Sequence, residues 1–384
     1  MLWAPEVADG MKAAPGSKGS NFTSMPRRIE IDRSTPLHEG ARGGHNRWHP
    51  DLEPIARVQP AEEVRVALRD SRDGSLSRES THETLLSTPS VAHPLTGPLW
   101  VEGAEPGDVL EIDVLSYETD DFGWTGIWPG SGFLGDLFTE PFLARWELAD
   151  GMARSEDVPG VAIPGAPFAG VVGVAPSHEL FAEALRREDA LASTGAQMDR
   201  PSAELAAPGS AADGLRTFPP RENGGNIDVR DLVAGSRLSL TVLVPGALLS
   251  VGDLHFAQGD GEVCIAAIET GGAITLRCNL RRDGWKPRFP VWESSGSPAP
   301  EGRRYLATTG IPLADDGSNA DTDLNLATRR ALIEMLDYLG AERGLSREQA
   351  YTLMSVAVEL RISELVDRPN ALVSALLPLD VFED

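Results

Sequence analysis

Alternation of apolar and polar residues dominates the chain from about residue 29 to residue 311. Such alternation is typical of strands with one buried face. The clearest runs are 64–68, 110–114 and 238–244. Turns rich in Gly and Pro separate the runs, as at 105–108 and 245–247. One helix, over 179–191, interrupts the strands, and the polar stretch after it, to about residue 208, is expected to cross the surface.

The hydrophobic period changes in the last quarter of the chain. Apolar residues recur at helical spacing from Leu324 to Leu339, which predicts a helix that ends near Gly340. Ser346 and Gln349 form a capping-box pattern at the start of a second helix. This helix is predicted to continue through Leu353, Ala357 and Leu360, with Pro369 soon after it.

These patterns divide the chain into three parts. Residues 1–28 are rich in Gly, Pro, Ala and Ser and are expected to form a flexible tail. Residues 29–320 are predicted to form a β-rich catalytic body, and residues 321–384 a helical extension that packs on it or on a neighbouring subunit. The predicted fold class is mainly β, α+β overall, with a C-terminal helical pair.

Composition narrows the choice of partner and compartment. The chain has 384 residues, with 58 Asp and Glu against 34 Lys and Arg, for a net charge of −24. This acidity argues against a nucleic-acid partner, because phosphate binding requires clustered cations. No segment has the apolar length of a membrane span or of a secretory signal. With only two cysteines, both in apolar runs that resemble strands, the chain is expected to be cytoplasmic.

The densest group of reactive residues lies between residues 250 and 264. Asp253 and His255 are two positions apart, so a strand would present both on one face. Asp260 and Glu262 repeat this spacing among glycines, which permit tight turns. Such a group suits a divalent metal or an acid–base function beside a polar substrate. The alternative is a hairpin whose Asp and Gly residues serve the turn while His255 lies in the core.

Two further polar segments have competing interpretations. Asn226 and Asp228 follow a Gly pair, which is ordinary turn chemistry, but they are also candidates to orient a substrate or metal ligand. His45 and His49 have the spacing of a metal-binding pair on a helix. Pro50 disfavours that helix, so a wall of the substrate site or a subunit contact is an equal alternative.

Nucleophilic catalysis has one candidate residue. Cys264 would share a strand face with Glu262, but a cysteine in an apolar run is usually an inert core residue. The sequence contains no GxSxG, SxxK, CxxC or P-loop motif. It therefore gives no support to a serine hydrolase or a nucleotide-binding enzyme.

Longer segments resemble the acetamidase/formamidase family over residues 45–376. They are HNRWHPD (45–51), AHPLTGPLWVEGAEPGDVLEIDVL (92–115), GFLGDLFTEPF (132–142), IPGAPFAGVVGVAPS (163–177), LRTFPPRENGGNIDVRDL (215–232), VPGALLSVGDLHFAQGDGEVC (244–264) and LRISELVDRPN (360–370). The first segment, the Pro-Pro-Arg-Glu-Asn run and the C-terminal helices resemble the longer, formamidase-type branch. Ile227 stands where a Met is expected, and residues 1–28 have no recognised counterpart.

The resemblance implies a β-sandwich or jelly-roll-like body, a homo-oligomer and hydrolysis of a short aliphatic amide to carboxylate and ammonia. Formamide is the first expected substrate and acetamide the second. The family is distinct from nitrilase-like amidases, so no Glu-Lys-Cys triad is expected. A lactam or carbamate substrate remains an alternative, as does a binding module without enzymatic activity whose polar loop holds a structural ion.

The resulting hypothesis gives each candidate residue a role. The expected cofactor is a divalent metal, with zinc as first choice, and its expected ligands are Asp253, His255 and Asp228, with Glu262 as a further possibility. The expected base is Glu262 or Asp260, and Asn226 is expected to support the oxyanion. The residues expected to line the substrate site are His45, Trp48, His49 and Phe256, with Trp124 and Phe133 as further aromatic candidates.

Overall fold

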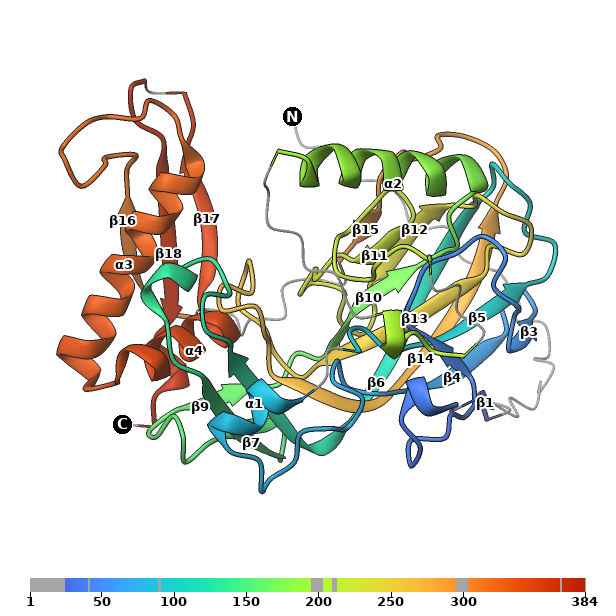
Figure 1. The fold of residues 1–384 in the computed structure, drawn as a ribbon, viewed down its shortest axis with the longest axis horizontal. Coiled ribbons are helices and arrows are strands. Elements are labelled where there is room, and N and C mark those ends of the chain that lie inside the picture. Colours follow the sequence, from blue (N-terminus) through green and yellow to red (C-terminus); the bar gives the residue numbers. More distant parts are fainter. Residues whose placement is uncertain are drawn as a thin grey trace, which may run out of the picture.

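The computed structural model describes residues 25–40, 42–88, 91–194, 203–208, 213–294, 303–366 and 368–383. Figure 1 shows a large β-rich body at one end and a smaller unit, made of the last helices and strands, at the other. Long strands run between the two ends. The polar stretch predicted to follow the internal helix, and the first 24 residues of the predicted tail, lie largely outside the described residues.

The body contains one extended sheet. Its strands are β1 (Arg27–Ile29), β2 (Gly44–His45), β3 (Ala56–Val58), β4 (Glu63–Leu68), β5 (Leu95–Val101), β6 (Val109–Ile127), β7 (Phe142–Ala149), β8 (Met152–Arg154), β9 (Ala162–Pro164), β10 (Phe168–Gly173), β11 (Gly224–Asn226), β12 (Arg237–Thr241), β13 (Leu249–His255), β14 (Glu269–Arg281) and β15 (Val291–Glu293). Neighbouring strands follow the path β11-β10-β13-β14-β6-β7-β8-β9, mostly antiparallel. The predicted strands coincide with β4, β6 and β12, so the mainly β fold class is confirmed.

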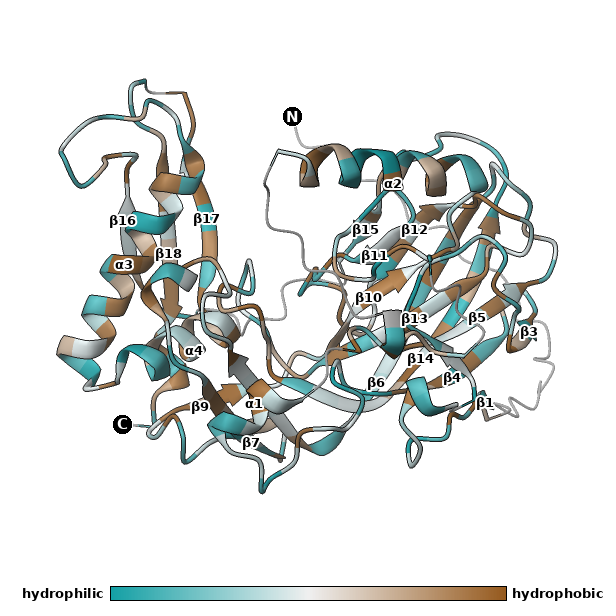
Figure 2. Cartoon of the chain, in the orientation of Figure 1, coloured by the Kyte–Doolittle hydropathy of each residue, from teal (hydrophilic) through white to brown (hydrophobic). Residues whose placement is uncertain are grey.

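The smaller sheet and the helices complete the fold. The second sheet has the order β16 (Tyr305–Gly310), β18 (Leu372–Pro378) and β17 (Glu359–Glu364). The α-helices are α1 (His82–Ser87), α2 (His178–Ala192), α3 (Leu324–Arg343) and α4 (Arg347–Ala357). Short 3-10 helices cover 37–39, 135–137, 203–205 and 379–381. Figure 2 shows polar and apolar residues alternating around α2, the internal helix predicted from its period.

Burial of β13 on both faces is the feature of the body that matters most for the site. This strand pairs with β10 along one edge and with β5 and then β14 along the other, and all seven of its residues are buried. The surrounding core contains Val66, Leu99, Ile112, Leu254 and Ile274. Polar side chains on β13 are therefore held where water has little access.

The C-terminal helices form as predicted, with two differences at their ends. Helix α3 begins at the Asp323 cap and ends at Gly344, which adopts φ 66°, so Gly340 lies inside the helix. Helix α4 has the predicted capping box at Ser346, but it ends at Ala357. Leu360 belongs instead to β17. The predicted extension thus contains strands as well as helices, and its sheet includes β16, which precedes residue 320.

Helix α4 is tied to the body by buried hydrogen bonds. The Tyr351 hydroxyl accepts from the backbone N–H of Leu134 at 2.8 Å and donates to the carbonyl of Val263. The Ser355 hydroxyl accepts from Cys264 N–H at 3.1 Å and donates to the Ala266 carbonyl at 2.7 Å. Helix α4 therefore holds the loop that follows β13.

We expect the substitution Tyr351→Phe to destabilise the protein by about 1–3 kcal/mol, because a buried backbone donor and acceptor would lose their partner. The control is Tyr338→Phe on α3, where the side chain is only half-buried and the expected change is below about 0.5 kcal/mol. Urea unfolding followed by circular dichroism measures both. Equal effects of the two substitutions would contradict this account of α4.

Candidate active site

The site begins with two side chains on one face of β13. Asp253 and His255 lie two residues apart, as predicted, and His255 Nε2 is 3.4 Å from Asp253 Oδ1. Antiparallel register places Glu269 of β14 directly opposite His255. The distance from His255 Nε2 to Glu269 Oε1 is 3.3 Å. Two adjacent strands thus bring an imidazole and two carboxylates together in the interior.

Two loops add further carboxylates. Asp228 follows β11, and its backbone N–H donates to the Gly170 carbonyl of β10 at 3.2 Å. Glu262 lies in the loop held by α4, with its Oε1 4.0 Å from His255 Nε2. Two overlapping triads have oxygen and nitrogen atoms close enough to share a metal ion: Asp228, Asp253 and His255, and His255, Glu262 and Glu269.

The backbone is unusual at three of the acidic residues. Asp228, Asp253 and Glu262 have φ values of 44°, 58° and 45°. Such left-handed conformations are uncommon for residues other than glycine and cost about 1–3 kcal/mol where the structure enforces them. Their occurrence at three members of one cluster indicates that the fold gives up some stability to aim these carboxylates.

Gly170 leaves room for the cluster. A Cβ atom at this position would lie 2.8 Å from Asp253 Oδ2 and 2.9 Å from the His255 ring, and closer still to Asp228 Oδ1. Because those distances are shorter than real Cβ contacts, any side chain here would displace the carboxylates. The space that the glycine opens is bordered by two carboxylate oxygens and the Cε1 atom of His255.

Several of these atoms are buried without a hydrogen-bond partner among the described residues. They are Asp228 Oδ1, Asp253 Oδ1, Glu269 Oε2 and both ring nitrogens of His255. Each buried polar group left unsatisfied costs about 1–3 kcal/mol, and native structures contain few of them. A cluster of unsatisfied oxygen and nitrogen atoms therefore fits a bound cation, so the donor set and its surroundings suit a divalent metal.

Protonation of the cluster reflects crowding of negative charge. Burial raises the pKa of Asp228 to about 8, with further contributions from Asp253 and Glu269. Burial also raises the pKa of Glu262 well above its usual value. For His255, burial lowers the pKa, but Glu269 and Asp253 outweigh it and raise the pKa well above 6.5. Without a cation, the raised pKa values favour the protonated forms of Asp228, Glu262 and His255. A divalent cation bound to the cluster would displace such protons.

Two members of this neighbourhood were missed by the sequence analysis. Glu269 opens β14 directly after an apolar run, and a charge in such a run is a signal that was available. His93 Nε2 lies 3.8 Å from Asp253 Oδ2, and its Nδ1 is buried without a partner among the described residues. Burial lowers the pKa of His93, so its ring is neutral. His93 lies within a family-like segment but had not been assigned a role.

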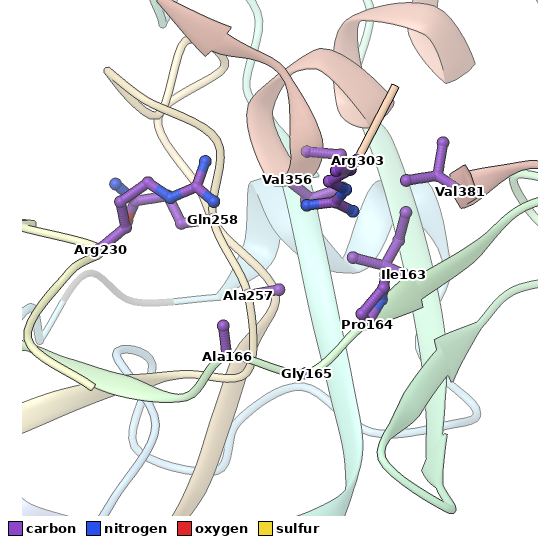
Figure 3. Close-up of a pocket in the computed structure, with 11 residues that line it drawn as sticks. Ile163, Pro164, Gly165, Ala166, Arg230, Ala257, Gln258, Arg303, Val356 and Val381 are labelled. Carbon is purple, nitrogen blue, oxygen red and sulfur yellow. The ribbon is translucent and has the colours of Figure 1, made fainter. Parts of the chain in front are cut away.

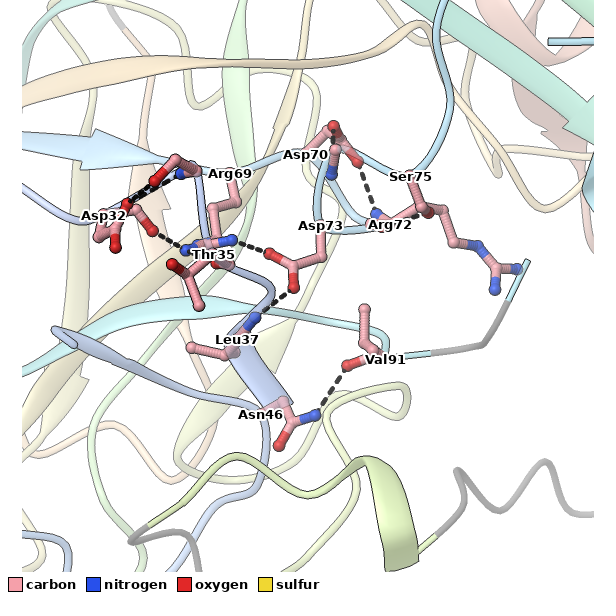
Figure 4. Close-up of polar contacts among 12 residues, drawn as sticks. Asp32, Thr35, Leu37, Asn46, Arg69, Asp70, Arg72, Asp73, Ser75 and Val91 are labelled. Carbon is pink, nitrogen blue, oxygen red and sulfur yellow. Dashed lines mark hydrogen bonds and ion pairs between the residues drawn. The ribbon is translucent and has the colours of Figure 1, made fainter. Parts of the chain in front are cut away.

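A polar network holds the loop that contains Arg69, Asp70 and Asp73 (Figure 4). Arg69 forms an ion pair with Asp73 and donates to the Thr35 carbonyl at 2.8 Å. The other Asp73 oxygen accepts from Leu37 N–H at 2.6 Å. The neighbouring Asp70 is buried, which raises its pKa to about 6, and Glu269 adds to that rise. The N-terminal segment therefore helps to hold an acidic residue near the cluster.

The structure separates Asp260 from the other acidic candidates. Asp260 belongs to neither metal-binding triad. Burial raises its pKa while Arg230 lowers it, and Glu359 is also nearby. Asn226 lies on β11, two residues before Asp228, and its Oδ1 is buried without a partner among the described residues. Glu262 therefore lies within the carboxylate cluster, whereas Asp260 does not.

The proposed substrate-site residues are distributed over several places. His45 Nε2 contacts Ser250 Oγ at 2.7 Å, its Nδ1 contacts the Arg47 carbonyl at 2.8 Å, and burial lowers its pKa to about 4. Trp48 packs in a small core with Leu95 and Val171. His49 packs against Phe181, so the two histidines do not form a metal pair on a helix.

The other aromatic candidates differ in exposure. Phe256 is buried and packs over Gly165, and Trp124 is buried with its Nε1 unsatisfied among the described residues. Phe133 is 41% exposed.

Cys264 lies in a turn, which corrects the strand predicted for this residue. The run from Val263 to Ile268 forms a loop because α4 supplies its hydrogen bonds in place of a neighbouring strand. The thiol is buried, and burial raises its pKa to about 12. Since the thiolate is the nucleophile, this environment disfavours nucleophilic catalysis by Cys264.

Among the described residues, no helix has the length and apolar character needed to cross a membrane.

Comparisons with known proteins place this geometry in context. The chain is 37% identical to a formamidase of Methylophilus methylotrophus over 93% of each chain. It is 35% identical to an acetamidase of Mycolicibacterium smegmatis, covering 87% of this chain and 90% of the relative. A solved structure of a gamma lactamase from Delftia acidovorans matches with a TM-score of 0.87 and 33% identity, over 93% of this chain and 94% of the other.

The profile of the Acetamidase/Formamidase family matches residues 30–384, which is nearly the whole chain. The sequence resemblance is therefore confirmed over a longer range than the segments that first indicated it. This protein belongs to the acetamidase/formamidase family.

Proposed function

We propose that this protein hydrolyses a short primary amide, with formamide as first substrate and acetamide as second, to carboxylate and ammonia. Membership of the acetamidase/formamidase family and the formamidase and acetamidase relatives support an amide hydrolase. The observation that carries the chemistry is the buried cluster of unsatisfied carboxylate and imidazole atoms around His255.

The cluster would hold a divalent cation, for which zinc is our first candidate. The proposed ligands are Asp253, His255 and Asp228, with Glu269 added because it lies opposite His255. Such a cation supplies Lewis-acid polarisation of an amide carbonyl and acidifies water. Mixed imidazole and carboxylate ligands are compatible with zinc, although oxygen-rich sites also bind manganese or magnesium.

Glu262 is the proposed general base. Its carboxylate approaches His255 from a loop, and it is the acidic group whose position is set by α4 rather than by the sheet. The carboxylate accepts a proton from the attacking water and returns it to the leaving nitrogen, so that the C–N bond breaks and ammonia departs. His93 and Asn226 are proposed to orient groups around the carbonyl, because each has a buried polar atom without a partner among the described residues.

A lactam is the second candidate substrate. The gamma lactamase that matches in structure favours it, and a cyclic amide passes through the same tetrahedral chemistry. A carbamate remains a further alternative from the sequence analysis.

The proposal extends to the oligomeric state and the compartment. We propose a homo-oligomer because exposed aromatic residues gather near β15, including Trp285 at 67% and Phe289 at 57% exposure. A cytoplasmic location accords with two free, buried cysteines. Light scattering tests the first proposal and cell fractionation the second.

The first experiment measures ammonia release from formamide, acetamide and a γ-lactam before and after chelation. We expect the highest turnover on formamide, loss of at least about 100-fold on chelation, and recovery with one added divalent metal. Turnover that survives complete metal removal would reject the metal and retain the amidase. Preference for the lactam would select the second substrate.

We expect Glu262→Gln to lower kcat on formamide by about 10²- to 10⁴-fold, because the amide cannot accept a proton at this position. Asp260→Asn is the matched control in the same loop and should change kcat by less than about threefold, since Asp260 faces Arg230. The reverse ranking of the two variants would assign the base to Asp260.

Gly170→Ala should lower metal affinity by about 10- to 100-fold, because the added methyl displaces Asp228 and Asp253. Gly340→Ala inside α3 is the control, since the only atom near its new Cβ is 3.7 Å away. Metal content after dialysis against a competing chelator distinguishes the two. Full metal retention in Gly170→Ala would show that the cation binds elsewhere.

A further inference from the structure

A small cavity, separate from the carboxylate cluster, lies between the body and the C-terminal unit. Its volume is about 40 Å³, and it is bounded by the β9–β10 connection, residues 257–258, the end of α4, and residues on either side of β16–β18. Figure 3 shows Arg230 and Arg303 on opposite sides of this cavity. Its walls include neither triad of proposed metal ligands.

Each guanidinium has a carboxylate beside it. Arg303 Nε donates to the two oxygens of Asp380 at 2.8 and 3.1 Å, which leaves its Nη edge toward the cavity (Figure 3). Arg230 Nη2 is 3.7 Å from Glu359. Its Nη1 is buried and has no hydrogen-bond partner among the described residues. Two fixed guanidiniums thus present N–H groups to one small space.

Apart from Gln258, the side chains of the remaining wall residues are apolar. Ile163, Ala257 and Val356 line it beside the two arginines. A guanidinium N–H left unsatisfied in such surroundings is costly, whereas a charge-assisted hydrogen bond to an oxyanion is among the strongest available. The arrangement fits a ligand with oxygen atoms at one end and a short apolar remainder.

Size restricts that ligand further. One water molecule requires about 10–15 Å³ of cavity volume. The cavity, at about 40 Å³, therefore accommodates about three or four non-hydrogen atoms. Formate has three and acetate four. Larger carboxylates would require the C-terminal unit to move away from the body.

The cavity also touches the active site through one residue. Gln258, which contributes to its wall, donates from Nε2 to the backbone carbonyl of Asp228 at 3.1 Å. Asp228 is a proposed metal ligand with a left-handed backbone. Occupancy of the cavity is therefore positioned to affect the carboxylate cluster.

We propose that this cavity binds a short-chain monocarboxylate between Arg230 and Arg303. The identification of this ligand as the product of the enzyme rests on the proposed function. The binding of a carboxylate does not depend on it. Filling the site would retain carboxylate next to the cluster and give product inhibition beyond simple competition at the catalytic centre.

Titration calorimetry with sodium formate and sodium acetate, at constant ionic strength, tests the proposal without any turnover. We expect one carboxylate site to weaken by about tenfold or more in Arg303→Gln and in Arg230→Gln. Arg361→Gln, an exposed arginine on β17, is the matched control and should bind as the unmodified protein does. Arg303→Lys keeps the charge but loses the planar fork, so it should bind with intermediate affinity.

Three results would overturn the proposal. The first is that the unmodified protein binds no carboxylate at up to about 100 mM. The second is that both glutamine variants bind carboxylate as tightly as the unmodified protein does. The third is that chloride or phosphate occupies the site as well as carboxylate does. A protein that binds carboxylate in this way but releases no ammonia from any amide would reject the proposed function and keep the site. An enzyme that releases ammonia from amides, but whose glutamine variants bind carboxylate unchanged, would keep the proposed function and reject the carboxylate site.

Discussion

The concentration of negative charge around one buried imidazole is the constraint on which the active site depends. Asp228, Asp253, Glu262 and Glu269 surround His255 in a region with little water. Like charges at such distances repel, and burial adds to the cost of ionising each carboxyl. Protons or a cation must therefore balance the cluster, and a divalent ion does so while satisfying several orphaned oxygen atoms together.

The charged residues of the cluster lie on two kinds of element, paired strands and loops. Asp253, His255 and Glu269 come from the paired strands β13 and β14, whose register determines their spacing. Asp228 is held by hydrogen bonds to Gly170. Glu262 is the exception, because its loop is held by Tyr351 and Ser355 of α4. The C-terminal unit thus contributes to the site without placing a charged residue in it.

The C-terminal unit contacts both the loop that carries Glu262 and the arginine cavity. The same boundary between unit and body carries the loop of Glu262 on one side and the arginine cavity on the other. Movement of α4 would change both, since Val356 lines the cavity and Ser355 holds the loop. One helix therefore contacts both the loop of Glu262 and the arginine cavity.

The periodicity of the sequence located several strands and helices, but not all of their ends. Alternation located β4, β6 and β12, and the 3.6-residue period located α2, α3 and the start of α4. These patterns are readable because each reports which face of one element is buried, and that is a local property. The i, i+2 spacing of Asp253 and His255 likewise placed both on one face of β13.

Only the tertiary structure decided which distant residues complete the site. Glu269 joins His255 through strand register, and His93 approaches Asp253 from a segment 160 positions earlier in the sequence. Asp260 and Glu262 have the same spacing as Asp253 and His255, yet they diverge because their segment is a loop bonded to α4 rather than a strand. Pairing between elements and the satisfaction of backbone hydrogen bonds depend on the whole chain, so no local pattern encodes them.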